Sequence, residues 1–141
     1  MKRIYSYKEP KKLLHIINRL EDIEGRLNVA PESQFIQLAT MKFNQGQTFS
    51  PHKHIWKKVK VEKTIAQESW VVIKGSVCVH LYDIDDTHIG DEIIKTGDCS
   101  ITFEGGHTYT ILEDDTVVYE YKTGPYYGAQ NDKAFIKDHR K

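Results

Sequence analysis

Short runs of β-forming residues dominate the chain from Ser33 onward. These runs are rich in Val, Ile, Thr and Tyr, and turn residues such as Gly, Asp and Asn separate them. Many short strands, evenly spaced over about 90 residues, favour a sandwich or barrel over a parallel sheet, and a jelly roll is the natural all-β solution at this size. The predicted strands are residues 34–43, 47–51, 54–64, 69–74, 77–84, 93–95, 100–103, 107–112 and 116–122.

The segment before these runs has helical spacing instead. Pro10 suits a first helical turn, Gly25 suits a helix end, and apolar residues recur between them. These residues are Leu13, Leu14, Ile16, Ile17, Leu20 and Ile23. The sequence thus predicts a single domain over residues 1–141. It has an N-terminal helical segment (1–32) with one α-helix over residues 9–24, a β-barrel (33–123), and a C-terminal loop and tail (124–141).

The balance of charge argues against two classes of partner. The 141 residues include 20 Lys plus Arg and 20 Asp plus Glu, so we expect no nucleic-acid partner and no membrane partner. The lysines of residues 53–63 are interpreted as a solvated edge strand. Residues 1–10 lack the apolar core of a signal peptide, and the two cysteines fit reduced core thiols, which predicts a cytoplasmic protein.

A histidine pair is the first feature with a chemical implication. His52 and His54 are two residues apart, so in an extended segment both imidazoles project from one face. Neutral imidazole is the commonest protein ligand for transition metals. His15, His80, His88 and His139 are interpreted as bystanders, and Cys78 and Cys99 as lying out of register with the histidine pair.

The spacing around this pair resembles the two short motifs of the cupin superfamily. Gly46 precedes His52 as Gly-x5-His-x-His, residues 68–75 form Glu-x6-Gly, and His107 follows Gly97 at the start of a strand. The gap between His54 and Glu68 is longer than in the common motif, and Phe103 stands where the second motif has proline. The resemblance covers residues 46–111 and implies a double-stranded β-helix, the jelly-roll barrel of small single-domain cupins.

In this family the motif residues bind one divalent metal ion inside the barrel. The resemblance therefore implies the ligands His52, His54, Glu68 and His107, with Gln67 as an alternative to Glu68. Three neutral nitrogens and one carboxylate suit iron, manganese, nickel, cobalt or zinc, and leave positions open for water or substrate.

The resemblance also implies a function. The expected activity is an isomerase, epimerase or dioxygenase reaction on a small polar substrate such as a sugar or sugar nucleotide, and the ending of the last strand resembles that of stand-alone cupins of carbohydrate metabolism. Tyr109, Glu120 and Lys122 are the candidates for proton transfer. A non-catalytic binding or sensing module and a metal-free epimerase remain alternatives, and a homodimer is expected from the pairing of small cupins.

Overall fold

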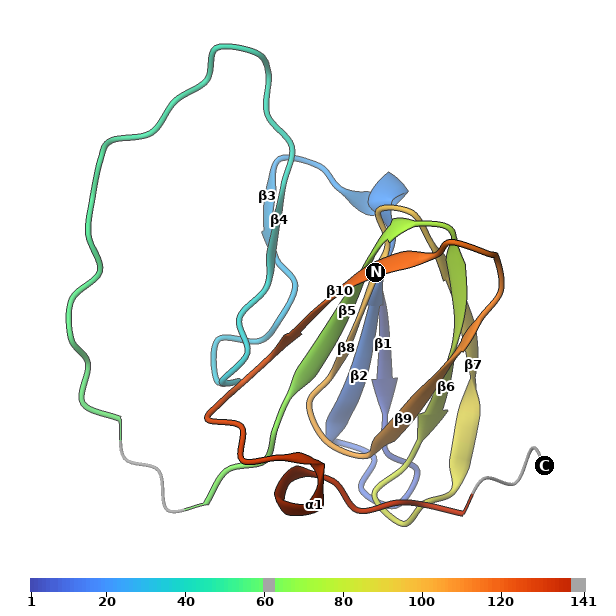
Figure 1. Cartoon of the computed structure of the whole chain (residues 1–141). Helices are drawn as coiled ribbons and strands as arrows, with labels where there is room; N and C mark the ends of the chain where they lie inside the picture. Colours follow the sequence, from blue (N-terminus) through green and yellow to red (C-terminus); the bar gives the residue numbers. More distant parts are fainter. Residues whose placement is uncertain (60–62, 138–141) are drawn as a thin grey trace.

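Two antiparallel sheets form the body of the molecule, which is seen here in a computed structural model (Figure 1). The structure describes residues 1–59 and 63–137. The larger sheet has the order β1-β2-β8-β5-β10, the smaller has the order β7-β6-β9, and β3 and β4 form a separate pair. The strands are β1 (Lys2–Tyr5), β2 (Leu13–Asn18), β3 (Arg26–Asn28), β4 (Ala39–Met41), β5 (Glu68–Lys74), β6 (Ser76–Tyr82), β7 (His88–Lys95), β8 (Cys99–Thr102), β9 (Gly106–Ile111) and β10 (Val117–Lys122).

One apolar core lies between the two sheets. Alternation along each strand sends every second side chain inward, and both sheets contribute fully buried aliphatic residues. Each side chain of this size contributes about 1.5–3 kcal/mol when removed from water. The cluster consists of Ile4, Ile17, Val72, Val77, Val79, Leu81 and Ile94.

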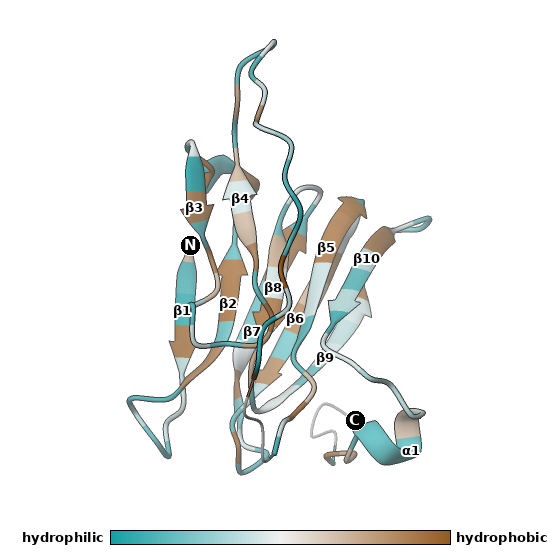
Figure 2. Ribbon diagram, turned by 90° about the vertical axis from the view of Figure 1, so that its left-hand side faces the viewer, coloured by the Kyte–Doolittle hydropathy of each residue, from teal (hydrophilic) through white to brown (hydrophobic). Residues whose placement is uncertain are grey.

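A second core covers the opposite face of the larger sheet. Ile16 of β2 and Ile101 of β8 pack there against Val29, Ala30 and Ile36, which lie in the connection between β3 and β4. The central strands β2 and β8 are therefore buried on both faces. Figure 2 shows the resulting concentration of hydrophobic residues in the strands of this sheet.

The predicted N-terminal helix is wrong. Residues 13–18 form β2, which pairs with β1 and β8, and only the short 3-10 helix η1 (Leu20–Asp22) follows. A strand buried on both faces has a continuous apolar run, and such a run also satisfies helical spacing. Pro10 lies in the turn between β1 and β2, so the sheet begins inside the segment that was assigned to a helix.

Two of the predicted strands are also wrong. The described parts of residues 42–67 form no strand, and residues 60–62 lie outside the described residues. The described part that leaves β4, up to residue 59, runs clear of the two sheets (Figure 1). The large apolar side chains of its described residues are exposed, Trp56 fully so. β-forming residues without a neighbouring strand have no partner strand for their backbone hydrogen bonds.

Helix is scarce in this fold. The one described α-helix, α1 (Ala129–Asp132), has four residues. Within the described residues, no helix has both the length and the apolar character to cross a lipid bilayer. The all-β prediction is confirmed.

Candidate functional site

Polar side chains occupy the end of the interior that the apolar core leaves free. Strand register places Glu68 of β5 opposite Thr102 of β8, and Thr102 opposite His15 of β2. All three are buried, with exposed fractions of 7%, 5% and 0%. Because buried polar groups are destabilising unless they are paired, each of them needs a partner within the fold.

The partner of Glu68 comes from the opposite sheet. Nε2 of His107, on β9, lies 3.0 Å from Oε1 of Glu68. Burial alone would raise the pKa of the Glu68 carboxyl. The hydrogen bond from His107, the attraction of this residue when it is protonated, and the charges of Lys133 and Lys122 outweigh burial and hold this pKa below its ordinary value. The carboxylate is therefore ionised at neutral pH, and Nε2 of His107 donates to it.

This hydrogen bond fixes the tautomer of His107. A neutral imidazole that donates from Nε2 carries its lone pair on Nδ1. Within the described part of the chain, the structure records no hydrogen bond to that Nδ1. The pair thus presents a histidine base oriented by an anionic carboxylate, which is the arrangement used in general acid–base catalysis.

His15 is held as a neutral imidazole behind this pair. Its Nδ1 lies 3.0 Å from Oγ1 of Thr102, and its Nε2 lies 3.1 Å from the carbonyl oxygen of Tyr82. Burial lowers the pKa of His15 to about 4, and repulsion from His107, when that residue carries a proton, adds to this effect. The Nε2–H group therefore donates to Tyr82, while Thr102 donates its hydroxyl proton to Nδ1.

An aromatic stack forms one side of the polar interior. The rings of Trp70 and Tyr109 are parallel within 3°, with centroids 3.8 Å apart. The Tyr109 hydroxyl lies 3.1 Å from Oγ of Ser100, and burial raises the pKa of this phenol. Tyr109 therefore stays protonated at neutral pH, and it is suited to donating a hydrogen bond rather than accepting a proton.

A cavity of about 670 Å³ opens beside Glu68 and His107. Asp132, the last residue of α1, and residues 133–137 after it form one wall, and Figure 1 shows this segment crossing one end of the two sheets. Gly106 allows Ile136 of this segment to pack closely against β9, since a Cβ at position 106 would lie 2.5 Å from Cδ1 of Ile136. Lys133 also lines the cavity. The sequence analysis predicts only a loop and tail over residues 124–141, so it does not predict this wall of the cavity.

The other two candidates for proton transfer lie on β10, beside this polar interior. Glu120 accepts a hydrogen bond from Nε1 of Trp70 at 3.2 Å. Lys122 is the cross-strand partner of Glu68. Its Nζ lies 3.6 Å from Oδ2 of Asp132, 3.9 Å from Oε1 of Glu120 and 3.7 Å from the ring centroid of Tyr126. These contacts position Lys122 as part of a charged network.

The structure brings together only two of the four predicted metal ligands. Glu68 and His107 are in contact, whereas His52 and His54 lie on the exposed segment before β5, with their ring centroids 5.5 Å apart. The Gln67 amide faces elsewhere: its oxygen accepts from the Ile36 backbone at 2.9 Å, and its nitrogen donates to Gln34 at 2.6 Å. The four-ligand centre stays a prediction.

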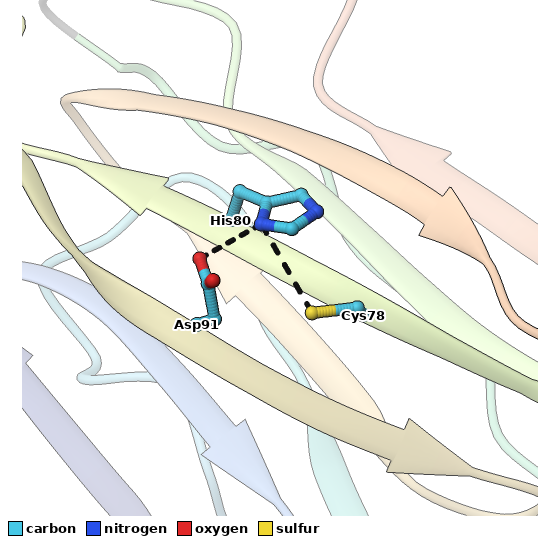
Figure 3. Close-up of side chains that lie close together, drawn as sticks. All are labelled: Cys78, His80 and Asp91. Atoms are coloured by element: carbon cyan, nitrogen blue, oxygen red, sulfur yellow. Dashed lines mark hydrogen bonds and ion pairs between the residues drawn. The ribbon is translucent and has the colours of Figure 1, made fainter. Parts of the chain in front are cut away.

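A different group of ligand atoms converges on the smaller sheet. Cys78 Sγ, His80 Nδ1 and an Asp91 carboxylate oxygen lie within 4.8 Å of one another, and they could hold a metal ion (Figure 3). The sequence analysis interprets His80 as a bystander and Cys78 as a reduced core thiol, so it does not predict this group. The Cys-x-His spacing of Cys78 and His80 within one strand was the sequence signal for this group. The third residue, Asp91 of β7, is identified only by the pairing register of β6 and β7.

One glycine shapes the backbone beside the site. Gly105 has φ +83°, and a Cβ there would lie 2.6 Å from the carbonyl oxygen of Tyr82, the acceptor for His15. We expect Gly105→Ala to lower the free energy of unfolding by at least about 2 kcal/mol, because backbone strain and a clash with main chain add together. Urea denaturation at pH 7 measures this loss.

Gly46→Ala is the matched control. Gly46 has φ +84° but no atom within 4 Å of the added Cβ, so only the conformational term remains, about 1 kcal/mol or less. Equal losses in the two variants would show that the Tyr82 carbonyl does not constrain position 105.

The chain matches no protein-family model, no curated protein and no solved structure. The function of the site therefore follows from the chemistry of its residues.

Proposed function

We propose that this chain is a cupin-type enzyme that moves a proton on a small polar molecule, with His107 as the base and Glu68 as its orienting carboxylate. The observation that carries the proposal is the 3.0 Å hydrogen bond between these residues at the edge of a cavity of about 670 Å³. A cavity of this size suits one small ligand. The reaction class is isomerisation or epimerisation, which needs a base at a C–H bond next to a carbonyl group.

The order of the strands supports the jelly-roll part of the proposal. After β5 the chain enters the smaller sheet for β6 and β7, returns to the larger sheet for β8, crosses again for β9 and returns for β10. Repeated crossing between two facing antiparallel sheets is the connectivity of jelly-roll folds. Glu68 and His107 lie on opposite sheets, so this crossing is what makes them neighbours.

In the proposed reaction, Nδ1 of His107 removes the proton and Glu68 stabilises the imidazolium that forms. The negative charge that develops on the substrate oxygen needs a donor, and Lys133 is a cation in the cavity wall. His107 then returns the proton from Nδ1 to the substrate. Ile136, which is partly buried, adds an apolar side chain to the cavity wall.

The charge of the cavity narrows the class of substrate. Its wall contains five carboxylate residues and two lysines: Glu68, Asp83, Asp86, Glu104 and Asp132 against Lys133 and Lys137. An acidic wall repels anions. An uncharged aldose or ketose is therefore favoured over a sugar nucleotide.

The metal centre implied by the cupin resemblance does not fit the residues as the structure places them. Glu68 and His107 supply two donors in contact, but His52 and His54 are on the exposed segment. The mechanism above therefore uses no metal. Loss of activity on treatment with a chelator, restored by one divalent metal, would favour the four-ligand centre instead.

The first test is exchange of substrate hydrogen with solvent. We expect the purified chain, treated with EDTA and placed in D₂O, to incorporate deuterium next to the carbonyl of one or more neutral aldoses or ketoses from a panel. Proton NMR follows the loss of the C–H signal. Saturable binding without exchange would favour a binding or sensing module, and neither binding nor exchange across neutral and nucleotide-linked sugars would overturn the proposal.

A further inference from the structure

The outer face of the smaller sheet carries a second set of chemically active residues, independent of the proposed enzyme site. His80 and Cys78 are two residues apart on β6, the central strand of this sheet, so both project from one face (Figure 3). Asp91 of β7 is the cross-strand partner of His80. Its Oδ1 lies 2.7 Å from Nδ1 of His80, and Sγ of Cys78 lies 4.0 Å from the same nitrogen.

A β-bulge brings a fourth residue to this face. In a regular strand, His88 and Asp91 would point to opposite faces because they are three residues apart. The register of β6 and β7 shifts between Leu81 and Tyr82, so that Leu81 pairs with Gly90 and Tyr82 with His88. Bulges re-aim side chains in this way. As a result, Nε2 of His88 also lies 2.7 Å from Oδ1 of Asp91.

We propose that Cys78, His80 and Asp91, with His88 as a fourth donor, form a binding site for a borderline divalent metal ion of the zinc and cobalt type. Such ions prefer thiolate sulfur, imidazole nitrogen and carboxylate oxygen as donors, and Cys78, His80 and Asp91 supply one of each. In a tetrahedral site the ligand atoms lie about 3.3–3.6 Å apart, given metal–ligand distances of about 2.0–2.3 Å. The observed separations of 2.7 and 4.0 Å bracket this range, so small side-chain rotations suffice.

Thr110 supplies the outer partner that metal-bound histidines need. Its Oγ1 lies 2.9 Å from Nε2 of His80. When the metal replaces the proton on Nδ1, that proton moves to Nε2, where the Thr110 oxygen accepts it. The Cys78 thiol loses its proton to solvent as the metal–sulfur bond forms, so binding releases one proton.

The site is accessible from solvent yet rigidly supported. The side chains of Asp91 and His88 are 46% and 39% exposed, whereas that of His80 is 8% exposed. β6 pairs with a strand on each side, which fixes Cys78 and His80. An ion can therefore enter from the Asp91 side.

Titration with cobalt(II), in the presence of a phosphine reductant, tests the site directly. We expect one equivalent to bind with a thiolate-to-cobalt charge-transfer band and the intense visible absorption of tetrahedral cobalt, both removed by zinc. Cys78→Ser should abolish the charge-transfer band. Cys99→Ser, which changes the thiol on β8 of the other sheet, should retain it.

Two more variants keep the test informative if Cys78→Ser does not fold. Asp91→Asn, at an exposed position, should weaken cobalt affinity about tenfold or more. The double variant His52→Ala/His54→Ala should leave the spectrum unchanged, because those residues lie on the segment before β5. Absence of a cobalt–thiolate band in the parent, a full band in Cys78→Ser, or unchanged affinity in Asp91→Asn would overturn the proposal.

Discussion

Replacing His107 with glutamine should slow deuterium exchange into the substrate by about 10²–10⁴-fold, the range for loss of a positioned general base. Glutamine keeps an N–H donor for the Glu68 carboxylate but has no basic nitrogen. The ionised Glu68 therefore retains a partner, and the fold is expected to survive. Proton NMR of the exchanging C–H signal measures the rate, and urea denaturation confirms that the variant is folded.

Two further variants separate the base from its surroundings. Glu68→Gln should slow exchange less than His107→Gln, because the base remains while its orientation and the stability of its cation are reduced. His52→Gln, a change to an exposed histidine on the segment before β5, should leave the rate unchanged. A folded His107→Gln variant with the parental rate would assign the base elsewhere.

Acid should destabilise the fold through His15, well above the pH at which carboxylates protonate. The pKa of His15 is about 4 in the folded protein against an ordinary value of 6.5. The unfolded chain therefore binds this proton more tightly than the native state. The stabilisation is fully present above pH 6.5 and is lost as the pH falls toward 4. The whole effect amounts to about 3 kcal/mol, of which about 2 kcal/mol is lost by pH 5.

Urea denaturation at pH 7, 6 and 5 measures this loss, and His15→Gln is the variant that isolates it. Glutamine keeps a donor for the Tyr82 carbonyl but does not titrate. We expect the variant to be less stable at pH 7, with a much smaller fall in stability between pH 7 and pH 5. A fall as steep as that of the parent would place the responsible group elsewhere. An NMR titration of the His15 ring should give a pKa far below that of exposed histidines.

Local pattern was enough to predict most of the second half of the fold. From residue 68 to residue 122 the chain alternates between inward and outward side chains, and glycine turns such as Gly75 separate the strands. The predicted strands in this region are confirmed with small shifts of their ends, except that β7 begins at His88, five residues before the predicted strand 93–95. Alternation and turn chemistry act over a few residues, so the sequence alone contains this information.

The N-terminal half shows where local pattern fails. Residues 13–18 are apolar at nearly every position, which fits one face of a helix or a strand covered on both faces. Two independent cores decide in favour of the strand: Ile17 faces the sandwich interior, whereas Ile16 faces Val29 and Ala30. Neither layer can be deduced from the residues of β2 itself.

Sequence by itself determined that this chain is all-β and that Glu68 and His107 stand at or near the beginnings of strands. Only the tertiary structure decided that these two residues meet, that His15 lies behind them, and that Asp91 joins Cys78 and His80. The physical reason is the range of the forces involved. Periodicity assigns a side chain to a face, but its partner depends on strand register and on the packing of one sheet against the other.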